Sequence, residues 1–222
     1  FARCKSTFEK LVLMQHYKIP TRLLDISLDP LTALFFAIYE DPLYKINKSK
    51  DATILVYGVP ENLIKNYHSD AVSVVANLAI YDKETFDVSA MPDTSTKVGC
   101  AKFNAEQSML YLLHEIRAEK PYFMDVIKKE DLGKILCVHP LLDNPRIKVQ
   151  QGAFLLFGLD GSNKKLATYE KNPDIKVFKI CIPSNARGRL EEELKILSKT
   201  VDNVYPDWDG ARDYFERYWN KE

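Results

Sequence analysis

The sequence predicts an α+β fold, because its strongest helical patterns come early in the chain and most strand-like runs come late. Asn104 and Gln107 begin a predicted helix whose apolar stripe runs from Met109 to Ile116, and Pro121 stops it. Residues 135–138, 146–157 and 176–182 are rich in β-branched and aromatic side chains, which favour strands. Strands and helices do not alternate regularly, so we expect an α+β domain rather than repeated βαβ units.

Size and composition suit one domain with a full core. The chain has 222 residues, 46% of them hydrophobic, and its 31 basic and 31 acidic residues cancel. A neutral balance argues against non-specific nucleic-acid or membrane binding, and no apolar run reaches the ~18 residues of a membrane span. The four cysteines lie far apart without metal-binding spacing, and Cys137 and Cys181 fall within strand-like runs, which favours buried thiols over disulfides. We therefore expect a cytoplasmic protein with no membrane partner.

Two helices are predicted near the N-terminus, on either side of a polar run. Ser6 begins a capping-box pattern for the first helix, and Pro20 should end it. Asp29 followed by Pro30 is typical of the start of the second helix. The polar run between them, residues 15–27, is expected to be extended or turn-like.

Shorter elements are predicted along the rest of the chain. Residues 53–57 favour a strand, 60–66 a short helix, 82–100 a long loop and 158–161 a hairpin turn. The last elements are a helix through Leu190, Leu194 and Leu197, a turn at 205–210 and a helix at 211–219.

The polar run at 15–27 is the strongest candidate for chemistry. Its polar side chains include His16, Thr21, Arg22, Asp25 and Ser27. The forked guanidinium of Arg22 suits a phosphate or a carboxylate, yet Asp25 is close enough in sequence to hold that fork as an ion pair. The polar groups either form hydrogen bonds with one another in a structural network or face a ligand. Local chemistry leaves both alternatives open.

Several familiar kinds of site are absent from the sequence. It has no glycine-rich phosphate loop, no paired histidine spacing for a metal and no GxSxG nucleophile turn. Asp207 and Asp209 have a spacing that permits a shared cation, but a turn before the last helix explains them more simply. No metal is therefore predicted.

The predicted strand at 146–157 supplies a second candidate site. Alternation along it places Arg146, Lys148 and Gln150 on one polar face. This face either lies in solvent or contacts a ligand. Gly152 either introduces a bulge or permits close approach of the backbone.

Three segments resemble the FRG domain family, which is named after a Phe-Arg-Gly motif. The first segment has QHY at 15–17, PTRLLD at 20–25, PL at 30–31 and ALFFA at 33–37. Two later segments follow in the family's order: Arg146 with QQG at 150–152 and Phe154, then YPDWDG at 205–210. On this resemblance we expect residues 1–222 to form a single FRG-like domain.

The chain departs from the family pattern at a few positions. Lys18 stands where the family usually has glycine, and Ile26 where it usually has tryptophan. The naming motif is not matched, since residues 1–3 and 186–188 are in the wrong places for it. We expect the motif to lie upstream, so that this chain lacks the N-terminal part of the domain.

The resemblance implies a function that the residues alone do not. The family occurs in bacterial and phage-encoded proteins, in settings that suggest toxins or anti-phage defence. The chain is also distantly similar to the ADP-ribosyltransferase fold, a mixed or antiparallel sheet core with surrounding helices, whose substrate is NAD. By that similarity Arg22 would contact the diphosphate or support the pocket, Asp25 would orient Arg22, and Gln150 would position the acceptor or a ribose hydroxyl. The remaining implied cofactor-binding residues are His16, Tyr17, Thr21 and Ser27.

Two hypotheses follow. Glutamine cannot act as a general base, so Gln150 in place of glutamate favours a nucleic-acid acceptor or a non-catalytic pocket over efficient protein modification. The alternative is a non-enzymatic binding module, in which His16, Arg22 and Asp25 form a buried network and residues 82–100 contact a protein or nucleic-acid partner. The enzyme hypothesis requires Arg22 and Gln150 to line one pocket.

Overall fold

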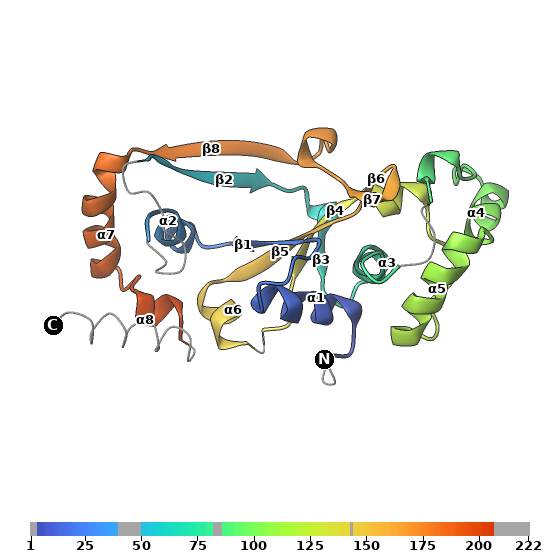
Figure 1. The fold of residues 1–222 in the computed structure, drawn as a ribbon, viewed down its shortest axis with the longest axis horizontal. Helices are drawn as coiled ribbons and strands as arrows, with labels where there is room; N and C mark the ends of the chain where they lie inside the picture. Colours follow the sequence, from blue (N-terminus) through green and yellow to red (C-terminus); the bar gives the residue numbers. More distant parts are fainter. Residues whose placement is uncertain (1–3, 40–49, 82–85, 143, 207–222) are drawn as a thin grey trace. The chain divides into compact units, whose positions relative to one another are not determined.

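The computed structural model describes residues 4–39, 50–81, 86–142 and 144–206, and it confirms an α+β protein (Figure 1). The α-helices are α1 (Thr7–His16), α2 (Pro30–Ile38), α3 (Asp70–Asn77), α4 (Lys97–Asn104), α5 (Gln107–Glu119), α6 (Pro145–Val149), α7 (Arg187–Ile196) and α8 (Val201–Val204). The strands are β1 (Leu23–Ser27), β2 (Ala52–Gly58), β3 (Ile64–Asn66), β4 (Ile135–His139), β5 (Gly152–Phe157), β6 (Leu159–Asp160), β7 (Ser162–Leu166) and β8 (Lys176–Ile182).

The chain forms two compact units, each assembled from three separate segments. The first unit comprises Phe1–Leu24, Val59–His139 and Phe154–Ile175. The second unit comprises Asp25–Gly58, Pro140–Ala153 and Lys176–Glu222. Because the chain passes repeatedly between the units, neither is a contiguous stretch of sequence. That residues 1–222 act as a single FRG-like domain stays a prediction.

The largest sheet is mixed, with the strand order β1-β5-β4-β3. Strands β4 and β5 are antiparallel, with Cys137 opposite Leu155, whereas β3 runs parallel to β4. The four residues Ile135 to Val138 of β4 are buried, as their apolar sequence predicts for a central strand. A mixed sheet with helices is thus confirmed, while likeness to the ADP-ribosyltransferase fold stays a prediction.

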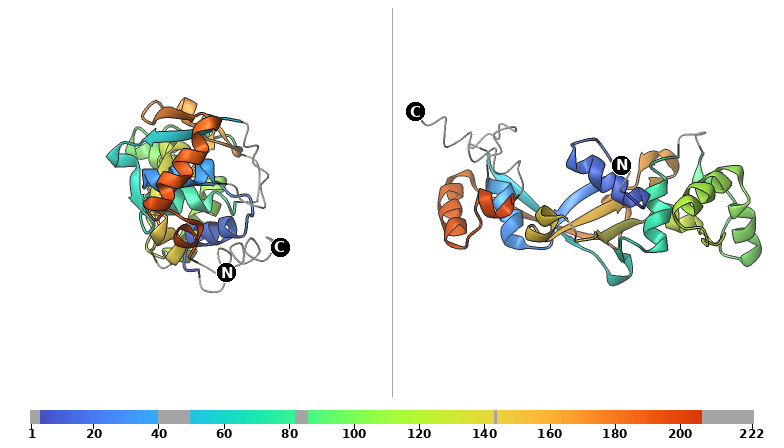
Figure 2. Two further views of the ribbon diagram at one scale, coloured as in Figure 1. Left: turned by 90° about the vertical axis from the view of Figure 1, so that its left-hand side faces the viewer. Right: turned by 90° about the horizontal axis from the view of Figure 1, so that it is seen from below.

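Helix α3 is central to the first unit and contacts both α1 and α5. The predicted stripe on α5 is confirmed, because Met109, Leu112, Leu113 and Ile116 are all fully buried. Figure 2 shows the green helices α4 and α5 side by side. The hairpin turn predicted near residue 160 is also confirmed: Gly161, at φ 76°, joins β6 to β7 in a conformation that suits glycine.

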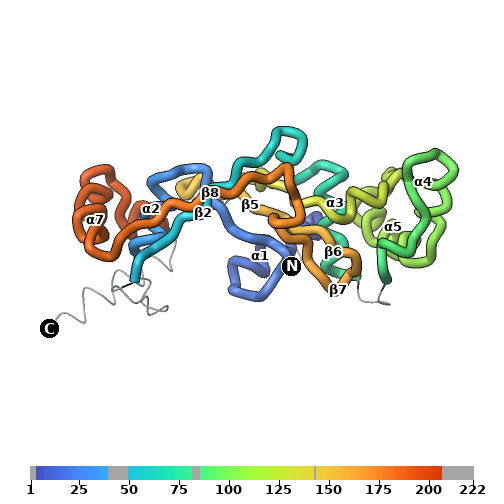
Figure 3. The backbone as a smooth tube through the Cα atoms, turned by 90° about the horizontal axis from the view of Figure 1, so that it is seen from above, coloured from blue at the N-terminus to red at the C-terminus, as the bar shows by residue number. Residues whose placement is uncertain are grey.

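The second unit is built on the antiparallel pair β2 and β8, which lie side by side in Figure 3. Helix α2 contacts both β2 and α7. Its start is as predicted, with Pro30 in the first turn and the Asp29 side chain accepting from the N–H of Leu31 at 3.0 Å. The core of this unit is one cluster of buried residues: Phe35, Ile38, Ala52, Ile182, Leu194 and Val204.

The predicted strand at 146–157 is wrong in its first half. Pro145 and the capping side chain of Asn144, which accepts from the N–H of Arg146 at 2.8 Å, start helix α6 instead. Gln150 ends this helix, Gln151 has a positive φ of 46°, and the strand begins only at Gly152. Local capping therefore overrides the β-propensity of the run.

Other boundaries also differ from expectation. The predicted loop at 82–100 contains the start of α4, which Thr96 caps by accepting from the N–H of Gly99. Asn104 ends α4 rather than starting α5, whose N-cap is Glu106. The short helix expected at 60–66 is one 3-10 turn, Glu61–Leu63, followed by β3. Cys137 is buried as predicted, whereas Cys181 on β8 is exposed because its face of the strand is uncovered.

Three predictions fall wholly or partly outside the described residues: the helix at 211–219, the last four residues of the turn at 205–210 and the first four residues of the loop at 82–100. None of the helices that the structure describes combines the length and the apolar character needed to cross a bilayer.

We expect Asn104→Ala to destabilise the first unit by about 3 kcal/mol, because it leaves several buried backbone groups without partners. The Asn104 amide donates to the carbonyls of Cys100 at 2.8 Å and Ile127 at 2.9 Å and accepts from the N–H of Ile127 at 3.2 Å. Urea unfolding followed by circular dichroism measures the loss. Asn66→Ala, at an exposed position, is the control and should cost under about 1 kcal/mol. Equal losses in the two variants would contradict this account.

Candidate anion site around Arg22

Arg22 joins two elements of the first unit. It precedes β1, and its Nη1 donates to the carbonyl of Phe157 at 3.0 Å while its Nη2 donates to the carbonyl of Leu78 at 3.3 Å. Leu78 is the C-cap of α3, whose last carbonyls lack helical partners. A cation at this end of a helix is favourable both for hydrogen bonding and for the helix dipole. Arg22 therefore ties the end of α3 to the end of β5.

These two bonds do not satisfy the guanidinium. An arginine has five N–H donors, so three donors of Arg22 have no acceptor among the residues that the structure describes. The side chain is 8% exposed, and within the described part of the first unit it forms no ion pair. Burial lowers the pKa of Arg22 to about 10, so the group remains charged at neutral pH. A buried positive charge with unused donors favours an anionic ligand.

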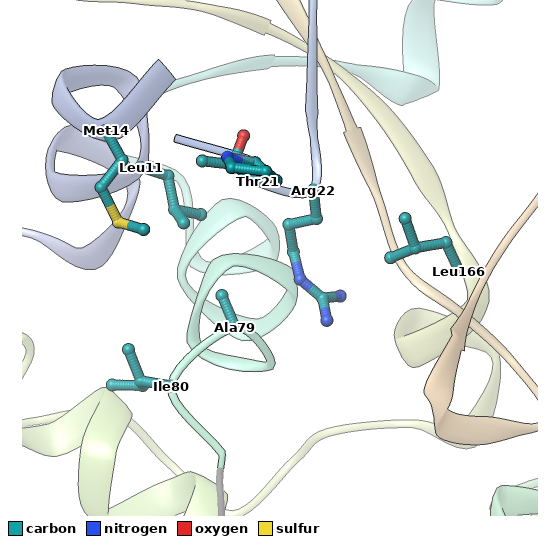
Figure 4. Close-up of a pocket in the computed structure, with 8 residues that line it drawn as sticks. Leu11, Met14, Thr21, Arg22, Ala79, Ile80 and Leu166 are labelled. Atoms are coloured by element: carbon teal, nitrogen blue, oxygen red, sulfur yellow. The ribbon is translucent and has the colours of Figure 1, made fainter. Parts of the chain in front are cut away.

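A pocket of about 290 Å³ lies beside this guanidinium (Figure 4). Figure 4 shows Leu11 and Met14 of α1 on one side, with the Arg22 side chain extending between Ala79 and Leu166. The complete lining is Leu11, Met14, Pro20, Thr21, Arg22, Ala79, Ile80 and Leu166. Its walls are mostly apolar, and the charge comes from Arg22. Low polarity around the charge strengthens its attraction for an anion.

Thr21 and Gln15 hold the turn that presents Arg22. The Thr21 hydroxyl donates to Oε1 of Gln15 at 2.6 Å and accepts from the N–H of Leu23 at 3.1 Å. Of the predicted site residues, the structure thus brings Thr21 and Arg22 together on one pocket wall. His16 and Tyr17 end α1 in edge-to-face contact, and Tyr17 is 68% exposed. Neither of them is among the described residues that line the pocket.

Ser27 and Gln150 belong to a separate network in the second unit. The Ser27 hydroxyl donates to the carbonyl of Gln150 at 2.7 Å, and the Gln150 side-chain Nε2 donates to the carbonyl of Val204 at 2.9 Å. The guanidinium of Arg146 lies 4.7 Å from the ring centre of Tyr205, a distance suited to a cation–π contact. Residues from all three FRG-like segments therefore meet in this unit.

Gln150 occupies a different setting from the predicted one. It caps α6 instead of standing on a strand face, because α6 takes the preceding residues. Its Nε2 is engaged, and its Oε1 accepts no hydrogen bond from the described residues. Arg22 lies in the first unit, whereas Gln150 and Asp25 lie in the second. A pocket shared by Arg22 and Gln150, and the orienting role of Asp25, stay predictions.

A partly buried ion pair beside Ser27 was missed from the sequence. The Nζ of Lys199 donates to Oδ2 of Asp29 and, at 3.1 Å, to the hydroxyl of Thr32, which itself donates to Asp29 at 2.6 Å. Burial alone would raise the pKa of Asp29, but hydrogen bonds from Lys199, Thr32 and the N–H of Leu31 outweigh it and lower the pKa to about 2. Asp29 was recognisable as a helix cap, whereas Lys199, 170 positions away, gave no sequence signal.

Comparison with known families agrees with the first of the three segments. The model of the FRG domain matches residues 2–45, which include both the polar run and α2. The FRG resemblance is thus confirmed over these residues. Comparisons with curated proteins and with solved structures give no match.

We expect Arg22→Ala to destabilise the first unit by about 2 to 4 kcal/mol, because it leaves the carbonyls of Leu78 and Phe157 without donors. Arg22→Lys should cost about half as much, since an ammonium can still reach one carbonyl. Arg117→Ala removes a solvent-accessible ion pair with Asp125 and one hydrogen bond to the carbonyl of Phe123, and it serves as the control with a loss of about 1 kcal/mol. Denaturant unfolding compares the three variants. An Arg22→Ala protein as stable as the wild type would contradict the role of Arg22 in joining α3 to β5.

We expect Asp29→Asn to lower stability in a pH-dependent way. Because the fold depresses the pKa of Asp29, its contribution is present above the ordinary value near 4 and is lost as the pH falls toward 2. Urea unfolding of both proteins from pH 2 to pH 6 should show a gap of about 1 to 2 kcal/mol at pH 6 that closes near pH 2. Asparagine keeps the helix cap, so a gap independent of pH would contradict the ion-pair explanation.

Proposed function

We propose that this FRG domain binds the phosphate portion of NAD in the pocket beside Arg22 and splits the nicotinamide–ribose bond, as an ADP-ribosyltransferase-like protein would. The observation that carries the proposal is the buried, charged guanidinium beside an apolar pocket, with three N–H donors that have no acceptor in the described part of the chain. Phosphate oxygens match a planar guanidinium fork better than a single carbonyl does. The pocket volume of about 290 Å³ is at the lower end for ligand sites, so it suits a phosphate-bearing part of the dinucleotide.

In the proposed reaction the side chains mainly bind and orient the substrate. The bond between the ribose carbon and the nicotinamide nitrogen breaks, and its electron pair leaves with nicotinamide. The oxocarbenium-like ribose is then attacked by an acceptor nucleophile, which loses a proton. Holding the diphosphate and orienting the ribose supply most of the acceleration. The family resemblance, rather than the pocket, suggests Gln150 as the residue that positions a ribose or acceptor hydroxyl.

The biological setting follows from the family resemblance. We propose a bacterial toxin or anti-phage defence effector whose acceptor is a nucleic acid or a protein. Gln150 cannot remove a proton from the acceptor, which supports an acceptor that is already nucleophilic. No metal is required for this chemistry.

A non-enzymatic binding module is the second candidate, and a specific observation favours it. Much of the polar run is satisfied internally: Thr21 by Gln15 and Leu23, and Ser27 by Gln150 and Asp29. Buried polar networks of this kind also rigidify a fold without any ligand. The two candidates differ in whether Arg22 has an anion to bind.

Calorimetry with ADP-ribose, NAD and adenosine tests the proposal on the intact natural protein. We expect ADP-ribose and NAD to bind and adenosine not to, because the anchor recognises phosphate. Arg22→Lys should weaken ADP-ribose binding at least roughly tenfold, since the lysine loses the fork. Arg117→Lys, at an exposed arginine of the same unit, should bind as the wild type does.

Nicotinamide release separates the enzyme from the binding module. Labelled NAD is incubated with the protein and a mixture of cell protein and nucleic acid, and both released nicotinamide and transferred label are counted. Binding without release would favour the binding module. Equal ADP-ribose affinity in the wild-type and Arg22→Lys proteins would reject the Arg22 site.

A further inference from the structure

A second buried arginine lies in the second unit, outside the segment that the FRG model matches. Arg187 is the first residue of α7 and is 8% exposed. Its Nε and Nη1 are enclosed, and neither has a hydrogen-bond partner among the residues that the structure describes. An arginine is charged at any physiological pH, and a buried charge without acceptors is strongly unfavourable. Such a group needs a partner that the described residues do not supply.

Arg187 lies on the inner face of its helix. Positions i, i+3 and i+7 share one side of a helix, and here they are Arg187, Leu190 and Leu194. Leu194 belongs to the core cluster of the second unit, and Leu190 packs against it. Side chains on a helix lean toward its N-terminus, so the Arg187 side chain leads from this face toward the start of α7.

The start of α7 is itself suited to an anion. Its N-cap, Ala186, provides no side-chain cap, and the first turn contains no acidic residue. A 3-10 turn, Ser184–Ala186, leads into the helix, and the N–H of Arg187 already donates to the carbonyl of Ser184, so the N–H groups available to an anion begin at Gly188. Its first residue is instead Arg187, although a positive charge at a helix N-terminus opposes the helix dipole. Gly188 is exposed, and nothing lies within 4 Å of where its Cβ would be. The backbone is therefore accessible at this end of the helix.

We propose that Arg187 anchors a binding site for a phosphate-type oxyanion at the N-terminus of α7. A tetrahedral anion with several oxygens accepts from the guanidinium and from backbone N–H groups at once, which a helix N-terminus favours. The enclosed nitrogens are Nε and Nη1, so Nη2 is the atom that an incoming anion meets first. A bound anion would pair with the buried charge of Arg187 and so reduce the free-energy cost of burying it. It is independent of the proposed role of Arg22 in the first unit.

Inorganic phosphate is the probe for the wild-type protein. The amide signal of Gly188 is followed by NMR while phosphate replaces chloride at constant ionic strength. We expect a saturable shift of this signal, together with a rise in melting temperature as phosphate binds the folded state. A Gly188 signal that does not move with phosphate would overturn the proposal without any variant.

Variants then assign the anchor. Arg187→Met removes the charge but keeps similar length, so the protein should be at least as stable as the wild type in phosphate-free buffer and should bind phosphate at least roughly tenfold more weakly. Arg189→Gln, two residues away on an exposed side chain, should keep the phosphate response. Arg22→Lys should also keep it, which separates this site from the proposed nucleotide pocket.

Two results would reject the assignment. An unchanged phosphate response in Arg187→Met would place the anion elsewhere. A marked loss of stability in Arg187→Met, equal with and without phosphate, would mean that a carboxylate of the chain itself pairs with Arg187. If Arg187→Met does not fold, Arg187→Lys replaces it, and weakened phosphate binding at Gly188 remains the expected result.

Discussion

The first unit depends on one buried charge. Arg22 donates to the carbonyl at the end of α3 and to the carbonyl at the end of β5, so a helix and a strand far apart in sequence share one donor group. A guanidinium can do this because its N–H groups diverge in a fixed plane. The other three N–H groups of the guanidinium have no acceptor among the described residues. The apolar pocket beside them raises the free-energy cost of leaving them unpaired. Structural support and affinity for an anion thus come from a single side chain.

The FRG-like segments meet in the second unit through contacts that are mainly structural. Ser27 binds the carbonyl of Gln150, Gln150 binds the carbonyl of Val204, and Arg146 lies over Tyr205. In this chain these contacts bring residues of the three segments together. Arg22 differs from Ser27 and Gln150, because three of its donors have no acceptor among the described residues.

The sequence predicted most helices and strands because their signals are local. Ser6, Asp29 and the stripe on α5 all behave as their patterns indicate, since caps and apolar periodicity act within a few residues. The prediction of a strand over 146–157 was wrong in its first half. Asn144 and Pro145 favour a helix start more strongly than the following β-branched residues disfavour a helix. The alternation of polar and apolar residues predicted Gln150 on a strand face. That prediction was wrong because Gln150 ends helix α6.

The candidate site was only partly predictable for a related reason. Arg22 and Thr21 were identified, because a fork-bearing residue in a polar run is visible in the sequence. Ala79, Ile80 and Leu166 complete the pocket from distant segments and are chemically unremarkable, so no pattern singles them out. The same holds for Lys199 beside Asp29 and for the burial of Arg187 at the start of α7. Tertiary packing decides these positions.

The central claim is that the unused donors of Arg22 receive a phosphate. The most direct measurement is the NMR signal of the Arg22 Nε–H group during titration with ADP-ribose and, separately, with adenosine. This account predicts a saturable shift with ADP-ribose that adenosine does not produce. An Arg22 signal that stays in place at saturating ADP-ribose would contradict it and leave Arg22 with its structural role alone.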